Sequence, residues 1–407
     1  MTWSTISKVL KSGPMTSHPH SDPKVVGRTP TGATLSFTPS ELFGAAARSS
    51  HLHTVNIAIA SWESVVMARL IEQYVDDVSP DFAILSKADT LKDYVKSYFA
   101  GTVAAGLAYL FMDREGYVWS DHFENVGGGN PKHGRKPDFV FAGPATGLAL
   151  MESKGSRSST IGRFDSTVLD GYEGQVEPHL GHTVGGQTAV RGYSVGSWMK
   201  PVTGASLRVH HTAPPPPASR TLTPASVVPV SGQDENLVQI QKHNFATAFG
   251  LAHSPLLAQA IRGSDPESVR VEYVPFLRFR WLGSYWVTGA MVPPAAWGEV
   301  ANLPFTTLIA KDDWPWMQAF SQSHLFAIRQ DVAELAMRSF MDEGAESDSR
   351  SIPFEVMSEG LRNRARVSDQ EGRGGAVFAD GLAMVRLESG VTELDLAVWR
   401  RGDDKFI

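Results

Sequence analysis

Three residues in the middle of the chain have the types and the spacing needed for metal-assisted hydrolysis of a phosphodiester bond. Asp138 precedes the apolar run Phe139–Phe141, and Glu152 and Lys154 follow the apolar run Leu148–Met151. If the two runs pair as neighbouring strands, all three side chains come to one edge of a sheet. A divalent cation takes hard oxygen ligands such as carboxylates, and it makes hydroxide available near neutral pH. The spacing therefore predicts a hydrolytic metal site.

The segment Pro137-Asp138, followed by Glu152-Ser153-Lys154, resembles the signature of the PD-(D/E)xK nuclease superfamily. The resemblance implies that Asp138 and Glu152 hold Mg²⁺ or Mn²⁺ and that the main-chain carbonyl of Ser153 adds a ligand. It also implies that Lys154 positions the attacking water. The implied fold is α/β, a restriction-endonuclease-like core with a mixed central sheet flanked by helices. In the alternative interpretation, two core strands simply end in a turn Asp and in a surface Glu and Lys.

A further element is similar to the RecB-like branch of that superfamily, which carries a Gln followed four residues later by a Tyr. In the helix predicted for 165–180, Gln175 matches the Gln, and His179 stands in place of the Tyr. Pro178 should bend or end this helix. The resemblance adds Gln175 to the catalytic residues as its weakest member. Thr102 stands where many members carry another Glu, which argues against a second metal ion.

The candidate site lies in a basic island of an acidic protein. The chain has a net charge of −6 and a pI near 6.1, yet residues 132–163 carry six Lys or Arg against two acidic residues. Contact with nucleic acid depends on local charge. We therefore expect Arg135, Lys136 and Arg157 to bind the phosphate backbone, with DNA as the substrate and RNA as the alternative.

Composition and missing motifs narrow the function. The chain contains no cysteine, which excludes disulfides, Cys-type zinc sites and thiol nucleophiles. It has neither a His-Glu-x-x-His helix nor an ATP-binding loop. Residues 1–13 lack the apolar stretch of a signal peptide, and the apolar stretch 100–112 is too short to cross a bilayer. The expected location is the cytoplasm, without a membrane partner.

Composition shifts divide the 407 residues into four parts. These are an N-terminal arm (1–50), the nuclease-like core (51–205), a Pro-rich linker or loop (206–235) and an α+β C-terminal region (236–407), which is an elaboration of the core or a second domain. Hydrophobic periodicity predicts helices at 54–77, 90–112, 236–257 and 314–341. It predicts strands at 188–199 and within 269–291, and a final hairpin of 376–387 with 391–399.

Two alternatives stay open at this level. Arg278 and Arg280 alternate with large apolar residues, which fits either a nucleic-acid surface with aromatic stacking or a sheet with its apolar face on the core. The whole chain is either an active nuclease or a catalytically inactive, nuclease-like subunit that acts as a scaffold or binds nucleic acid. The absence of a Glu at position 102, where the chain has Thr102, favours the inactive subunit. By analogy, the C-terminal half suggests a restriction or phage-defence effector that acts as a homodimer or with a partner protein.

Overall fold

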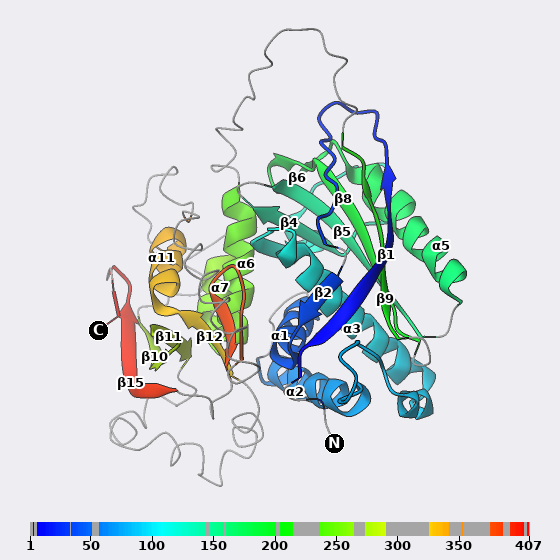
Figure 1. Cartoon of the computed structure of the whole chain (residues 1–407). Coiled ribbons are helices and arrows are strands. Elements are labelled where there is room, and N and C mark those ends of the chain that lie inside the picture. Colours follow the sequence, from blue (N-terminus) through cyan, green and yellow to red (C-terminus); the bar gives the residue numbers. More distant parts are fainter. Residues whose placement is uncertain are drawn as a thin grey trace.

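The protein is built on two large sheets (Figure 1). The computed structural model describes residues 3, 6–32, 34–50, 57–143, 146–157, 160–200, 204–214, 237–263, 273–289, 325–341, 352, 375–385, 391–402 and 405–406, with the backbone alone for 57–65. Most of the predicted linker, 206–235, lies outside the described residues.

The first sheet is a curled, mixed, seven-stranded sheet with the order β2-β1-β9-β8-β5-β4-β3. β1 runs parallel to β9 and β5 runs parallel to β8, while the other neighbours are antiparallel. The strands are β1 (Lys8–His18), β2 (Thr34–Phe37), β3 (Trp119–His122), β4 (Phe139–Gly143), β5 (Gly147–Ser156), β8 (Arg191–Trp198) and β9 (Ser206–Thr212). A separate two-stranded sheet pairs β6 (Thr183–Val184) with β7 (Gln187–Thr188). The mixed α/β architecture expected from the sequence is confirmed.

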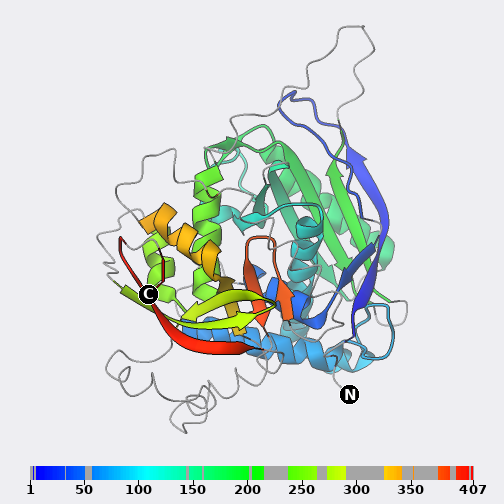
Figure 2. The ribbon, with the colours of Figure 1, turned by 60° about the vertical axis from the view of Figure 1, so that its left-hand side comes forward.

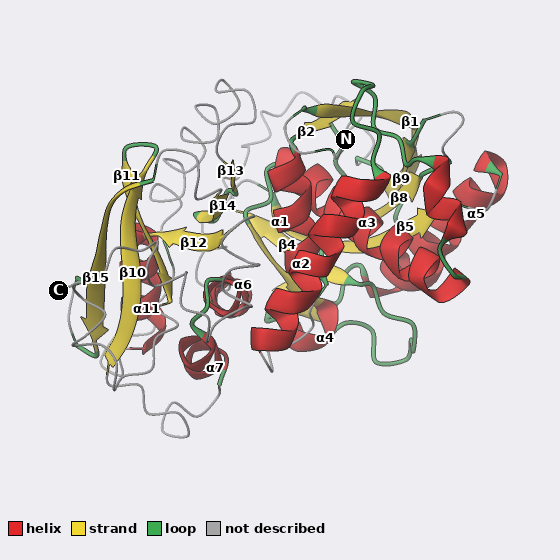
Figure 3. Ribbon diagram, turned by 90° about the horizontal axis from the view of Figure 1, so that it is seen from below, coloured by secondary structure: helices red, strands yellow, loops and turns green. Residues whose placement is uncertain are grey.

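Helices cover both faces of this sheet (Figure 3). The helices of this half are α1 (Pro39–Ser49), α2 (Ile57–Tyr74), α3 (Asp93–Arg114), α4 (Phe123–Val126) and α5 (Ile161–Gly171), with the short 3₁₀ helix η1 (Ser86–Thr90). Gly155 of β5 lies against Ala100 and Ala104 of α3, whereas Gly171 at the end of α5 lies over Glu152. Because alternate strand residues face opposite sides, α3 and α5 lie on opposite faces of β5.

Helix starts follow from local sequence. Thr38 and Glu41 form a capping box at the start of α1, in which each side chain bonds the other residue's backbone N–H. α3 begins after Lys92 and no side chain caps it; the hydroxyl of nearby Thr90 donates to the carbonyl of Lys87. α3 is the one described helix long and apolar enough to cross a membrane, and 67% of its most apolar window is buried inside the protein, as expected for a core helix.

The second sheet contains six antiparallel strands in the order β13-β14-β12-β11-β10-β15. Its strands are β10 (Tyr273–Trp281), β11 (Ser284–Gly289), β12 (Leu325–Arg329), β13 (Gly375–Val377), β14 (Leu382–Val385) and β15 (Thr392–Arg400), and the accompanying helices are α6 (Val238–Leu251), α7 (Pro255–Arg262) and α11 (Gln330–Met341). α6 packs against β3 at the edge of the first sheet. A buried ion pair between Arg48 of α1 and Asp380, joined by Asn244 of α6, links the two sheets.

Two expectations for the C-terminal half are wrong. The predicted helix 314–341 is a strand, β12, over its described part up to Arg329, and only α11 is helical. The run Leu325–Arg329 is fully buried between β11 and β14, and this tertiary burial outweighs its helical spacing. The predicted final hairpin is also split: β14 pairs with β13, whereas β15 pairs with β10 at the opposite edge (Figure 2).

Candidate active site

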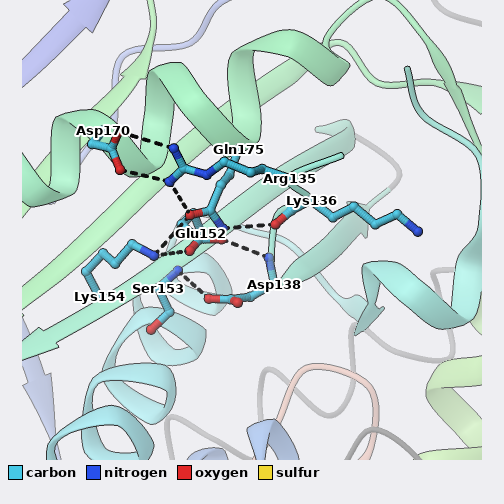
Figure 4. Close-up of polar contacts among 8 residues, drawn as sticks. All are labelled: Arg135, Lys136, Asp138, Glu152, Ser153, Lys154, Asp170 and Gln175. Carbon is cyan, nitrogen blue, oxygen red and sulfur yellow. Dashed lines mark hydrogen bonds and ion pairs between the residues drawn. The ribbon is translucent and has the colours of Figure 1, made fainter. Parts of the chain in front are cut away.

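Asp138 and Glu152 lie side by side where β5 continues past the start of β4. Phe139 pairs with Met151, so Asp138, one residue before β4, lies beside Glu152. The N–H of Asp138 donates to Oε2 of Glu152 at 3.0 Å, and the N–H of Ser153 donates to Oδ2 of Asp138 at 2.9 Å (Figure 4). The structure thus brings both predicted carboxylates to one place and fixes their orientation through two backbone amides.

Lys154 joins them from the same strand. It follows Glu152 by two residues, so both side chains are on the same face of β5. Its ammonium forms an ion pair with Oε1 of Glu152 and donates to Oε1 of Gln175 at 3.3 Å. The Lys154 side chain is 25% exposed and that of Glu152 only 1%. The amine therefore lies at the boundary between the core and the solvent, where a water molecule has access.

Gln175 connects this amine to the segment before Asp138. It lies in the π-helical turn η2 (Tyr172–Val176), which continues from α5. Its Oε1 accepts from Lys154 and from Nη2 of Arg135 at 3.0 Å, and its Nε2 donates to the carbonyl of Lys136 at 2.9 Å. All of these contacts use one carboxamide, so Gln175 holds two parts of the candidate site in a fixed relation. A π-helical turn of this kind is rare and is frequent at functional sites.

The end of α5 approaches the site so closely that any side chain at position 171 would crowd its residues. A Cβ there would lie 2.9 Å from Oγ of Ser194, 3.1 Å from Cγ of Glu152 and 3.2 Å from Cε of Lys154. These separations are shorter than ordinary carbon contacts. Gly171 therefore allows α5 to pack directly against Glu152 and Lys154, which restricts the positions of both side chains.

Burial raises the pKa of both carboxyl groups, and repulsion by Asp138 raises that of Glu152 further. Burial, and then the neighbouring Asp138, raise the pKa of Glu152 to about 7, although Lys154 opposes both effects. Burial also raises the pKa of Asp138, against the effect of the Ser153 amide and Lys154. Paired carboxyl groups of this kind are a feature of functional sites and not only of structural ion pairs.

The oxygen donors fit a small divalent cation. Two carboxylates with raised pKa values repel each other when ionised, and a cation between them would relieve that repulsion. The described residues hold no cluster of three or more His, Asp or Glu suited to a metal ion. A site with one or two carboxylates, completed by water and phosphate oxygens, is what Mg²⁺ prefers, whereas Ca²⁺ favours a larger set of protein ligands.

The carbonyl of Ser153 faces the same side as this pair. Within a strand, the N–H and the C=O of one residue point to the same neighbour. The N–H of Ser153 points to Asp138, so its carbonyl oxygen lies on the Asp138 side as well, beyond the end of β4. Asp138, Glu152 and the Ser153 carbonyl are therefore the groups that would hold the ion.

The three predicted phosphate contacts have different surroundings. Arg135 is exposed but makes a two-pronged contact with Asp170, at 2.8 and 3.3 Å. Lys136 is exposed, extends away from Glu152 (Figure 4), and makes no ion pair within the described part of the chain. Arg157 points elsewhere: its side chain is 1% exposed and bonds Asp89 at 3.0 Å. The contacts of Arg157 are with Asp89 and the carbonyl of Leu85, and they do not bring it to the other residues of the candidate site.

Sequence reasoning missed three participants. Asp170 neutralises Arg135, Gly171 admits α5 to the site, and His179 holds the segment before Asp138. The available signal was the glycine pair Gly171 and Gly174 inside a predicted helix, because an internal glycine often marks a close approach. No pattern in the sequence indicates which acid pairs with Arg135.

The alternating segment of β10 has the structure of an ordinary half-buried strand. Its aromatic residues at 276, 279 and 281 are buried. Arg278 pairs with Asp395, and Arg280 pairs with Glu393 at 2.9 Å. Buried rings offer no surface for stacking and the neutralised arginines offer little charge, so the structure favours the core-facing interpretation of this strand.

Comparisons with known proteins add no relative: no protein-family model, no curated protein and no solved structure matches the chain. The candidate site therefore rests on its own geometry.

Proposed function

We propose that this protein is a metal-dependent nuclease that hydrolyses DNA phosphodiester bonds. The observation that carries the proposal is the convergence of Asp138, Glu152 and Lys154 through hydrogen bonds that fix both carboxylates and the amine. Two hard anionic ligands beside a partly exposed cation match what hydrolysis of a phosphodiester requires. The exposed lysines near this group supply attraction for the phosphate backbone.

The residues divide the work as follows. Asp138, Glu152 and the Ser153 carbonyl would hold Mg²⁺ or Mn²⁺, which when bound supplies Lewis-acid charge at the phosphate and a more acidic water. Lys154, held by Glu152 and Gln175, orients a water at its ammonium and stabilises negative charge that develops on the phosphate. Gln175 keeps that ammonium in place. The attacking group is water, so no covalent intermediate forms.

The order α3, β3, β4, β5, α5, β8 is consistent with a restriction-endonuclease-like core, and we propose that fold for the first sheet and its helices. A cytoplasmic restriction or phage-defence effector, acting as a homodimer or with a partner protein, is the biological setting we propose for it.

The test is cleavage of supercoiled plasmid DNA with Mg²⁺ or Mn²⁺. We expect Asp138→Asn and Lys154→Met to reduce the cleavage rate by at least about 100-fold, because each removes charge from the transition state. Lys11 and Asp81 form an exposed ion pair, with side chains 70% and 54% exposed. Lys11→Met and Asp81→Asn are therefore the matched controls: they make the same chemical changes away from the candidate site at little cost in stability. Cleavage that persists in Asp138→Asn and Lys154→Met would overturn the proposal.

The alternative function is a catalytically inactive, nuclease-like DNA-binding or scaffold subunit. Thr102 favours it, because this residue of α3 is buried and carries no carboxylate. In the same assay, this function predicts DNA binding without cleavage in either metal, and binding that is unchanged in Asp138→Asn.

A further inference from the structure

The segment before Asp138 forms an exposed loop that carries positive charge at the edge of the candidate site. Residues 130–136, named here the basic loop, include Lys132 and Lys136. Both lysines are exposed, and neither makes an ion pair within the described ranges. None of the exposed large hydrophobic residues belongs to this loop. Its surface therefore suits phosphate groups and not the faces of bases.

His179 holds this loop with both of its ring nitrogens. The N–H of Asn130 bonds Nδ1 of His179 at 2.9 Å, and Nε2 of His179 bonds the carbonyl of Arg135 at 2.8 Å. A backbone amide can only donate, so Nδ1 must be the acceptor and Nε2 must carry the proton. One neutral imidazole thus ties both ends of the basic loop to the 3₁₀ turn η3 (Glu177–His179).

The surroundings of His179 are built for this role. Its ring is 1% exposed and contacts the ring of Phe123 at 5.2 Å between centroids. Gly129, with φ of +85°, brings the chain so close that a Cβ would lie 2.6 Å from Nδ1 of His179. Glycine is needed there for both reasons. The glycine triplet 127–129 is thus a shaped turn that delivers the loop to the histidine.

Neighbouring contacts reinforce the same attachment. Nδ2 of Asn130 donates to the carbonyl of Pro178 at 3.0 Å, and the ring of His133 bonds the carbonyl of Gly174 at 2.8 Å. Burial lowers the pKa of His179, and the cationic forms of His133, His182 and Lys136 lower it further. The hydrogen bond to the Arg135 carbonyl opposes these effects by raising the pKa. The neutral form that the two hydrogen bonds require is therefore favoured at neutral pH.

We infer that His179 is a positioning residue for DNA binding: by fixing the basic loop, it presents Lys132 and Lys136 to the phosphate backbone beside the Asp138–Glu152 pair. This inference rests on the proposed function for its substrate. His179 itself touches neither the substrate nor the carboxylates in this arrangement. Its effect should appear in the affinity for DNA and much less in the rate of the chemical step.

The test combines a ring-preserving variant with a measurement that needs no DNA. His179→Phe keeps an aromatic ring against Phe123 but removes both hydrogen bonds to the loop. We expect hydrogen exchange at the Asn130 amide to accelerate by about 10-fold or more, since that amide loses its acceptor. His182→Phe is the matched control, because no hydrogen bond of the His182 ring is found in the described part of the chain. It should leave exchange at Asn130 unchanged.

Affinity is measured for a fluorescent DNA duplex in EDTA, because the proposed metal-dependent cleavage does not proceed without a divalent cation. His179→Phe should raise Kd by about 10-fold, the effect expected from losing one or two hydrogen bonds, while kcat in Mg²⁺ changes by less than about threefold. His179→Gln, which can retain one of the two bonds, should recover part of the affinity. A Kd equal to that of the unaltered protein, in a variant whose Asn130 amide exchanges faster, would refute the positioning role.

A double-mutant cycle separates positioning from general stability. Replacing Lys132 and Lys136 by Ala changes only exposed side chains and should reduce the salt slope of log K by about 2, one for each phosphate that is no longer neutralised. In that background, His179→Phe should add little further loss. An equal loss in both backgrounds would mean that His179 does not act through these lysines. Absence of cleavage in every metal, with the cycle still intact, would refute the nuclease and leave DNA positioning standing.

Discussion

Replacing Glu152 by Gln should make the protein more stable above neutral pH. The Glu152 carboxyl has a pKa raised to about 7, first by burial and then by Asp138. A carboxyl group whose pKa is higher in the folded state than in the unfolded state favours folding only while it stays protonated. Stability should therefore fall as the pH rises from about 4.5 towards 7, and it should stay low above that value.

The size of the effect follows from the displacement of the pKa. The pKa of Glu152 rises from its ordinary value of 4.5 to about 7 in the folded protein. Each pH unit of this displacement corresponds to about 1.4 kcal/mol, so the free energy of unfolding of the unaltered protein decreases by about 3 kcal/mol as the pH rises past 7. Gln keeps an oxygen that accepts from the Asp138 amide but never ionises. The loss of the partner of Lys154 offsets some of the gain, since that ammonium keeps only Gln175 and solvent as partners. A net gain of about 1–3 kcal/mol at pH 8 is expected.

Thermal melts of both proteins from pH 5 to pH 9, without divalent metal, measure this effect. The Glu152→Gln melting temperature should match that of the unaltered protein near pH 5 and exceed it by several degrees at pH 8. Mg²⁺ should then stabilise the unaltered protein at pH 8 but not the variant, because ligand binding adds stability only where the site is intact. Asp81→Asn serves as the exposed control. Melting temperatures that run parallel across the whole range would refute the reasoning.

Three further predictions concern packing and charge. Gly171→Ala should reduce the cleavage rate by about 10-fold by displacing η2. Gly162→Ala in the same helix is the control: the space around Gly162 is open, so this change should be neutral or stabilising. Cleavage rates and melting temperatures of both variants check this prediction. Arg48→Met should cost about 3–5 kcal/mol, because Asp380 is left buried without its cation; adding Asp380→Asn should recover part of the loss in thermal melts. Burial lowers the pKa of His253 to about 4. The stability that the neutral imidazole contributes is complete above about pH 6.5 and should fall by about 3 kcal/mol as the pH drops to 4. Urea titrations should therefore show that the stability of His253→Asn depends less on acid pH than that of the unaltered protein.

Local patterns were sufficient to predict the strands that carry the candidate site. The apolar runs beside Asp138 and Glu152 are the parts of β4 and β5 that the core buries, and period-two alternation places Lys154 on the same face as Glu152. The mixed sheet and its flanking helices were expected from the resemblance of these two segments to the nuclease superfamily. These features depend on residues close together in the sequence, which is why they were predictable.

Features that depend on distant partners were not predictable. Arg157 was expected to bind phosphate, yet its buried side chain pairs with Asp89, a residue that no local pattern connects to it. The strand β15 has the sequence of a hairpin partner for β14, but pairs with β10 at the far edge. In both cases the outcome depends on which groups the folded chain brings together, and a single sequence does not record that.

The ion pair between Arg48 and Asp380 also bears on how the chain is made. Arg48 is synthesised 332 residues before its carboxylate partner Asp380 (380 − 48). At roughly 5–20 residues per second, that interval lasts tens of seconds. Throughout that interval, the Arg48 guanidinium, which is buried in the folded protein, lacks the carboxylate of its ion pair. We therefore expect the packing around Arg48 to be completed only after Asp380 has been synthesised, and nascent chains that stop before residue 380 to be substrates for chaperones and proteases.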